Sequence, residues 1–208
     1  MKKTVLLFLL AFMSYVLMAQ VRTTNLTVYS NFKPSIILLK DGRVLKQPLT
    51  NIFLKNSSLL YMQGTTSMQA NMDNIVSVKF DDRLYTKIDT VLAYEVDSVG
   101  AEKKLYKATI IDQVAYRQQL KNNQVITNFD MGDQISTSTI DLSTEDDYKF
   151  PLIDLFFYRI NGKIVKVHER HLSRILNKEQ KRMMKTYLSM PDFDWTDEKW
   201  LMELLRKL

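Results

Sequence analysis

The sequence predicts an α+β protein, in which an N-terminal small antiparallel β-barrel or sandwich is followed by a β-hairpin-containing module closed by C-terminal helices. Short apolar runs separated by turn residues fill the first half of the chain, and apolar residues recur at helical spacing near its C-terminal end. The composition, 46% hydrophobic and 25% charged over 208 residues, is typical of a globular chain. Because the chain contains no cysteine, disulfides, thiol nucleophiles and Cys-ligated metal sites are excluded.

Residues 1–19 have the pattern of a secretory signal peptide. Lys2 and Lys3 precede an apolar run at 4–18, and the small residue Ala19 follows. We predict cleavage after Ala19, which places the mature chain in the periplasm or in association with the outer membrane. A retained membrane anchor is the alternative, but the run is shorter than the about 20 apolar residues that a spanning helix needs. We expect no transmembrane segment after cleavage.

Residues 20–100 are predicted to form a β-rich module. Turn residues separate its short apolar runs at roughly ten-residue intervals, which is typical of a small barrel or sandwich. Asp41-Gly42 lies between two such runs and predicts a tight hairpin. The predicted strands are 36–39, 49–54, 58–62, 75–80 and 84–88, with an edge strand over 90–100.

Residues 35–88 resemble the small SH3-like or Sm-like barrels of many exported bacterial proteins. The resemblance lies in the order of an apolar strand, Lys-Asp-Gly at 40–42, NSSLLY at 56–61 and MDNIVSVKF at 72–80. It implies a fold without an activity, because barrels of this shape serve many unrelated functions.

Residues 101–208 are predicted to form the α+β module. Asn161-Gly162 favours a type I′ turn and predicts a hairpin of strands at 155–160 and 163–167. A short helix at 112–122 is expected to face inward with Val114, Ala115 and Leu120. Further strands are predicted at 105–111, 125–129 and 135–142.

Three short helices are predicted after that hairpin, and the last of them begins at Asp194 or Thr196. The apolar residues that mark the three helices are Leu172, Ile175 and Leu176, then Met183, Met184, Tyr187 and Leu188, and finally Trp200, Leu201, Leu204, Leu205 and Leu208. This block, with DEKWLMELL at 197–205, is similar to the tail of uncharacterised exported proteins of anaerobic Gram-negative bacteria. The similarity implies location and architecture and brings no activity.

An enzyme is the less favoured alternative. His168 and His171 are the only histidines, and helical spacing would bring them near enough to share a metal ion. A periplasmic hydrolase or metal-dependent enzyme would use this pair with carboxylates from 145–147 or from Asp192, Asp194 and Asp197. The sequence contains neither the His-Glu-x-x-His zinc motif nor a Gly-x-Ser-x-Gly elbow, so we expect no catalytic residue, metal or cofactor.

Charge is segregated along the C-terminal half: residues 129–154 are rich in acids and residues 155–190 in bases. We expect the bases to bind an anionic glycan, a lipid headgroup or an acidic protein, with Trp195 or Trp200 as an apolar anchor if exposed. Without residues 1–19 the formal net charge falls from +6 to +4, which does not indicate a nucleic-acid partner. The predicted binding residues are Arg159, Lys163, Lys166, Arg170, Arg174, Lys178 and Arg182. A solvated helix face, or neutralisation by the acidic block, is the alternative.

Two tripeptides, Asp89-Thr90-Val91 and Asp97-Ser98-Val99, resemble the O-glycosylation acceptor of some anaerobic Gram-negative bacteria. The resemblance implies glycans on Thr90 and Ser98 if these residues are exposed. Together the observations predict an exported, non-enzymatic envelope protein that acts by surface binding.

Overall fold

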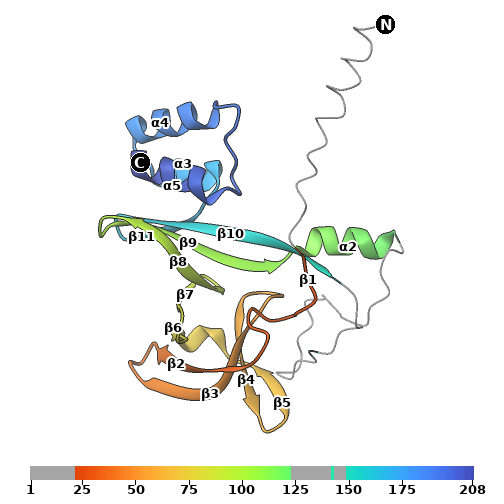
Figure 1. Cartoon of the computed structure of the whole chain (residues 1–208). Helices are drawn as coiled ribbons and strands as arrows, with labels where there is room; N and C mark the ends of the chain where they lie inside the picture. The colour runs from red at the N-terminus through yellow and green to blue at the C-terminus, as the bar shows by residue number, and fades with distance from the viewer. Residues whose placement is uncertain (1–21, 123–141, 143–148) are drawn as a thin grey trace, which may run out of the picture.

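The computed structural model describes residues 22–122, 142 and 149–208. These residues form a large antiparallel sheet with three helices gathered near one end, so the α+β class is confirmed (Figure 1). The predicted signal peptide at 1–19 and the predicted strand at 125–129 lie outside the described residues, as does the predicted strand at 135–142 apart from Leu142.

The sheet of the described residues has 11 strands in the order β1-β10-β9-β8-β7-β6-β2-β3-β4-β5, with β11 paired to β10. It is not closed. The strands are β1 (Arg22–Thr23), β2 (Lys33–Leu39), β3 (Val44–Phe53), β4 (Ser58–Gln63), β5 (Thr66–Gln69), β6 (Ile75–Lys79), β7 (Leu84–Ile88), β8 (Val91–Val99), β9 (Lys103–Ile111), β10 (Phe150–Ile160) and β11 (Lys163–Lys166). A short 3₁₀ helix, η1 (Met72–Asn74), precedes β6.

Both predicted hairpins are confirmed. Gly42, with a φ of 82°, allows the turn between β2 and β3. Asn161 and Gly162 have φ angles of 51° and 78°, the two left-handed positions that a type I′ turn requires. The turn brings Ile160 opposite Lys163 and sets the register of β10 against β11.

The strand predicted over 90–100 forms as β8, but it is not at the edge of the sheet. It pairs with β7 on one side and with β9 on the other. The sheet is therefore continuous across residue 100, while the division into modules at that residue stays a prediction.

The connection between β3 and β4 folds back onto distant strands. The amide of Ile111 donates a hydrogen bond to the carbonyl oxygen of Leu54 at 2.7 Å. The amide of Leu92 donates to the Ser57 carbonyl oxygen at 2.9 Å, and the Ser57 hydroxyl donates to the Leu92 carbonyl oxygen at 2.7 Å. These bonds satisfy polar groups of buried residues and tie the first hairpins of the chain to β8 and β9.

Helix α2 (Gln113–Lys121) begins at Asp112, whose carboxylate accepts hydrogen bonds from the amides of Val114 and Ala115. The expected inward face is wrong for Val114, which is 68% exposed. Tyr116 is the buried residue of this helix and packs against Phe150 with ring centroids 5.6 Å apart. The helix turns its aromatic residue inward because the ring fills the space beside β10.

The C-terminal helices are α3 (Glu169–Ile175), α4 (Lys178–Leu188) and α5 (Glu198–Lys207). Asp197, rather than Asp194 or Thr196, caps α5, and the Asp194 carboxylate instead accepts a hydrogen bond from the Thr196 amide. The three helices share a core with β9 and β10. Its buried residues include Leu105, Tyr158, Leu172, Met184, Leu201, Leu204 and Leu205.

Candidate functional site

The predicted binding residues lie on consecutive elements at the helical end of the molecule (Figure 1). All are exposed except Arg159, which is half-buried. We call these seven the basic surface: Arg159 on β10, Lys163 and Lys166 on β11, Arg170 and Arg174 on α3, and Lys178 and Arg182 on α4.

The basic surface is not one helical stripe. The chain leaves helical geometry at Leu176, whose ψ is 143°, and α4 starts anew behind Asn177. A capping box fixes this start. The backbone N–H of Gln180 donates to Asn177 Oδ1 at 2.9 Å, and the backbone N–H of Asn177 donates to Gln180 Oε1 at 3.1 Å. The four-residue spacing of the bases therefore spans two separate helices.

The basic surface lacks carboxylate partners among the described residues, where none of its side chains forms an ion pair within 4.0 Å. Lys104 and Lys107 of the sheet, in contrast, form ion pairs. Lys107 Nζ lies 2.7 Å from Asp154 Oδ2 and 2.8 Å from Glu198 Oε1. Burial acts to lower the pKa of Lys107, but hydrogen bonds to the two carboxylates outweigh it and raise the pKa to about 12. Most of the predicted acidic block, including 145–147, lies outside the described residues.

Helix α4 carries further bases that were not among the predicted binding residues. Lys181 and Lys185 join Lys178 and Arg182 along an open hollow of about 610 Å³. The signal was present in the sequence, because the spacings 178, 181, 182 and 185 place residues on one helix face.

A second hollow is lined both by predicted binding residues and by residues that were not predicted. Lys166 and Arg174 line it with His171, beside the turn between β7 and β8. Its volume is about 520 Å³. The contribution of the β7–β8 turn was not predictable, because that turn is far from the basic segment in sequence.

The two histidines are neighbours, with ring centroids 6.0 Å apart. His168 precedes α3 and its Nδ1 accepts a hydrogen bond from the Arg170 amide at 3.2 Å, so this nitrogen serves as a helix cap. The ring of His168 stacks on Trp195 at 6.1 Å. Within the described ranges, no group of three or more His, Asp or Glu side chains is placed to hold a metal ion.

The tryptophans named as possible anchors are both half-buried. Trp195 packs against the core of the C-terminal helices, and Phe193 contacts the rings of both tryptophans, with centroids 5.0 Å from Trp195 and 6.1 Å from Trp200. Of the predicted carboxylates, Asp194 and Asp197 accept backbone hydrogen bonds at the start of α5. Asp192 is exposed.

The predicted glycosylation residues are both exposed. Thr90 lies in the turn between β7 and β8, next to Asp89 with its φ of 55°. Ser98 lies near the end of β8, where its amide donates to Asp97 Oδ1. Val91 and Val99, which follow them in the two tripeptides, are half-buried. Glycosylation of Thr90 and Ser98 stays a prediction.

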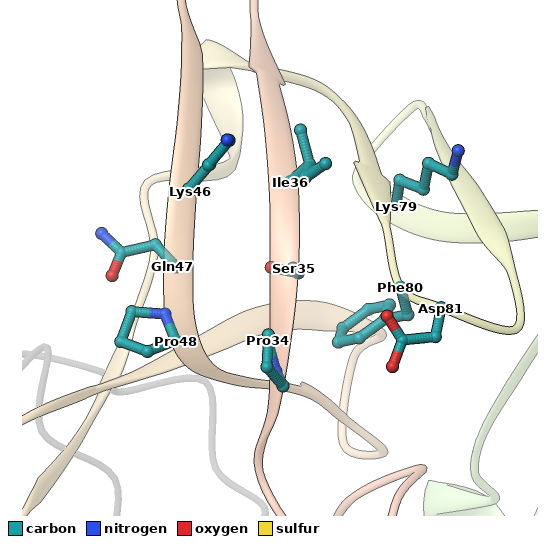
Figure 2. A pocket seen from close by; sticks show the side chains of 9 residues that line it. All are labelled: Pro34, Ser35, Ile36, Lys46, Gln47, Pro48, Lys79, Phe80 and Asp81. Atoms are coloured by element: carbon teal, nitrogen blue, oxygen red, sulfur yellow. The ribbon is translucent and has the colours of Figure 1, made fainter.

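A third hollow lies on β2, β3 and β6 (Figure 2). These strands lie at the opposite end of the molecule from α3 and α4 (Figure 1). Ile36 is 42% exposed and faces outward between its cross-strand partners Lys46 and Lys79. Pro34 and Pro48 extend the apolar floor of this groove, whose volume is about 730 Å³. Sequence reasoning missed it because residues 36–39 of β2 form a continuous apolar run, which does not tell which face of the strand is covered.

Comparison of the chain with protein-family models, with curated proteins and with solved structures finds no match. No helix in the described part of the chain is both long and apolar enough to cross a bilayer. The basic surface and its two adjoining hollows are therefore the observations from which a function is argued.

Proposed function

We propose that this chain is an exported, non-enzymatic envelope protein whose basic surface binds an anionic envelope component, namely a phosphate-bearing glycan or lipid headgroup. An acidic protein is the alternative partner. The observation that carries the proposal is the absence of ion pairs on the basic surface, within the described residues, next to sheet cations that are paired. The location in this proposal depends on the signal-peptide pattern of residues 1–19.

Physical reasoning supports binding by a spread of cations. Lys178, Lys181, Arg182 and Lys185 line one hollow of α4, so several phosphate oxygens can be contacted at once. Exposed cations without intramolecular partners retain their full attraction for an external anion, and salt weakens that attraction by screening.

We also propose that residues 35–88 form a module of the SH3-like type. Support comes from the strand order β7-β6-β2-β3-β4-β5, in which β6 returns to pair with β2, and from η1 just before β6. In this proposal the module is a scaffold, and the outward groove beside Ile36 is a feature of its surface (Figure 2).

The binding proposal is tested with purified protein and lipopolysaccharide, a phosphate-bearing glycolipid. The test variant replaces Lys178, Lys181, Arg182 and Lys185 of α4 by Gln. The matched control replaces four exposed lysines elsewhere by Gln: Lys40, Lys46, Lys79 and Lys121. Both variants lose the same net charge, so a difference between them reports location.

We expect the α4 variant to bind about tenfold more weakly than the control, and the binding of the wild-type protein to fall with increasing salt. Capture that is insensitive to salt, or equal losses in both variants, contradicts docking by the basic surface.

A further inference from the structure

The hollow beside Lys166 is formed by the β10–β11 hairpin and α3, which follow one another in the chain, and by the β7–β8 turn, which is distant from them in sequence. We call it the β11–α3 hollow. Its volume of about 520 Å³ falls in the range of roughly 300–1,000 Å³ found for small-molecule sites. Strand pairing of Phe157 with Lys166 fixes one wall, since β10 and β11 are held in register by the Asn161-Gly162 turn.

The floor of the β11–α3 hollow is apolar. Phe157 and Ile88 are buried in a shared cluster at its base, and Val165 and Ile175 are half-buried beside them. Ile164 is 41% exposed, which leaves aliphatic surface open to solvent. Such surface favours a ligand with an apolar body, because contact removes both surfaces from water.

The rim of the hollow is mainly cationic. Lys166 and Arg174 are exposed, and neither forms an ion pair with a carboxylate of the described residues. Lys87 also lines the hollow, with its Nζ 3.9 Å from Asp73 Oδ1. Asp89 is the carboxylate among the lining residues. The cations outnumber it, so the rim favours an anionic group.

His171 adds a directional partner. Its imidazole is half-buried in the first turns of α3 and lines the same hollow as Arg174. An imidazole in any protonation state has at least one N–H that can donate to an anion, and the Arg guanidinium donates in a planar fork that matches a carboxylate.

We propose that the β11–α3 hollow binds a small amphipathic anion, a carboxylate carried on an aliphatic body, with the head group at Lys166 and Arg174 and the aliphatic part over Ile164 and Phe157. This inference deepens the proposed function, because Lys166 and Arg174 belong to the basic surface. It differs in requiring apolar contact, which a purely electrostatic surface does not need. An exposed lysine cluster alone would not distinguish octanoate from acetate.

The first experiment measures calorimetric binding of octanoate, acetate and octanol to the purified full chain. We expect octanoate to bind at one site and acetate to bind about tenfold or more weakly, because acetate lacks the methylene groups that contact the floor. Octanol is expected to bind weakly because it lacks the charge. Equal affinity for octanoate and octanol, or for octanoate and acetate, would overturn the proposal.

The second experiment uses two double variants with the same charge change on the same two elements. Lys166→Gln with Arg174→Gln removes cations that line the hollow, whereas Lys163→Gln with Arg170→Gln removes exposed cations of β11 and α3 that do not line it. We expect the first pair to weaken octanoate binding about tenfold and the second by less than about twofold. Equal effects overturn the assignment to this hollow.

A third variant tests the apolar floor. Ile164→Ser changes an exposed side chain, so we expect the fold to be retained. It should weaken octanoate binding while leaving lipopolysaccharide binding unchanged. If octanoate fails to bind the wild-type protein while lipopolysaccharide binds in a salt-dependent way, the hollow is wrongly assigned and the proposed function stands. If lipopolysaccharide binding also fails, the proposed function falls with it.

Discussion

The phenolic hydroxyl of Tyr158 donates a hydrogen bond to the backbone carbonyl oxygen of Leu201 at 2.5 Å. Both residues are fully buried, and the bond joins the C-terminal part of β10 to α5. It is therefore a polar link inside a largely apolar core, at the place where the C-terminal helices meet the sheet.

Replacing Tyr158 by Phe should lower the free energy of unfolding by about 1–3 kcal/mol, because the carbonyl oxygen of Leu201 loses its hydroxyl partner in a buried position. Urea unfolding followed by circular dichroism measures the loss. Tyr61→Phe, on the half-buried end of β4, is the matched control and should change stability by much less. A Tyr158→Phe variant as stable as the control would show that the hydrogen bond contributes nothing.

Alkaline solution should destabilise the protein through the same tyrosine. Burial raises the pKa of Tyr158 well above its ordinary value of 10.0. The folded state therefore keeps the proton above pH 10.0 while the unfolded chain releases it, so this contribution to stability is complete below that pH and is lost as pH rises beyond it. The free energy of unfolding, measured between neutral pH and pH about 11, should fall by up to about 1.4 kcal/mol per pH unit for each such group.

The pKa of Tyr29 is raised as well. Burial is the main cause, and the hydrogen bond from its hydroxyl to Asp82 adds to it. Tyr158→Phe should therefore remove only part of the alkaline slope. A slope identical to that of the wild-type protein would contradict the assignment to Tyr158.

Lys107 should be the most important ion-paired cation of the sheet. Its side chain is 18% exposed and bridges Asp154 on β10 and Glu198 on α5. Lys107→Met leaves the two carboxylates without their shared cation, so we expect a loss of about 2 kcal/mol in the free energy of unfolding. Lys104→Met, which breaks the more exposed Lys104–Glu95 pair, is the control and should cost less than about 1 kcal/mol. Equal losses would argue against a special role for the bridge to α5.

The turn between β10 and β11 should be sensitive to its glycine. Gly162 has a φ of 78°, and an added Cβ would meet no atom within 4 Å, so the cost of Gly162→Ala is backbone strain alone. We expect a loss of about 1–2 kcal/mol, seen as a lower Tm in thermal unfolding. Gly162→Asn should cost less, because asparagine tolerates the left-handed region better than alanine. Equal costs for the two variants would show that the strain is not conformational.

Local features of the fold were predictable because their causes are local. Asp41-Gly42 and Asn161-Gly162 meet the backbone requirements of tight turns, and the structure confirms both hairpins. The three C-terminal helices followed from apolar spacing. The inward face of α2 was predicted wrongly, since Val114 and Tyr116 are both apolar candidates and only the space beside Phe150 selects the tyrosine.

The candidate site was predictable in part. The bases of the basic surface were named from charge segregation, and their exposure follows from the cost of burying an unpaired charge. The break at Leu176 and Asn177, which divides the stripe, became visible only with the backbone geometry of the two helices. No sequence pattern indicated that the turn at Asp89 lines the same hollow as Lys166.

By itself the sequence determined the α+β class, the two tight hairpins, the three C-terminal helices, the absence of thiol chemistry and the separation of acids from bases, because each depends on composition or on neighbours along the chain. It did not show β1 or β5. Only the tertiary structure decided that β8 lies inside the sheet, that Ser57 bonds to Leu92, and that the β7–β8 turn, β11 and α3 enclose one hollow. Ser57 and Leu92, like the β7–β8 turn and β11, are far apart in the chain, and the position of β8 depends on which strands pair on both of its sides. No short window of sequence records such relationships.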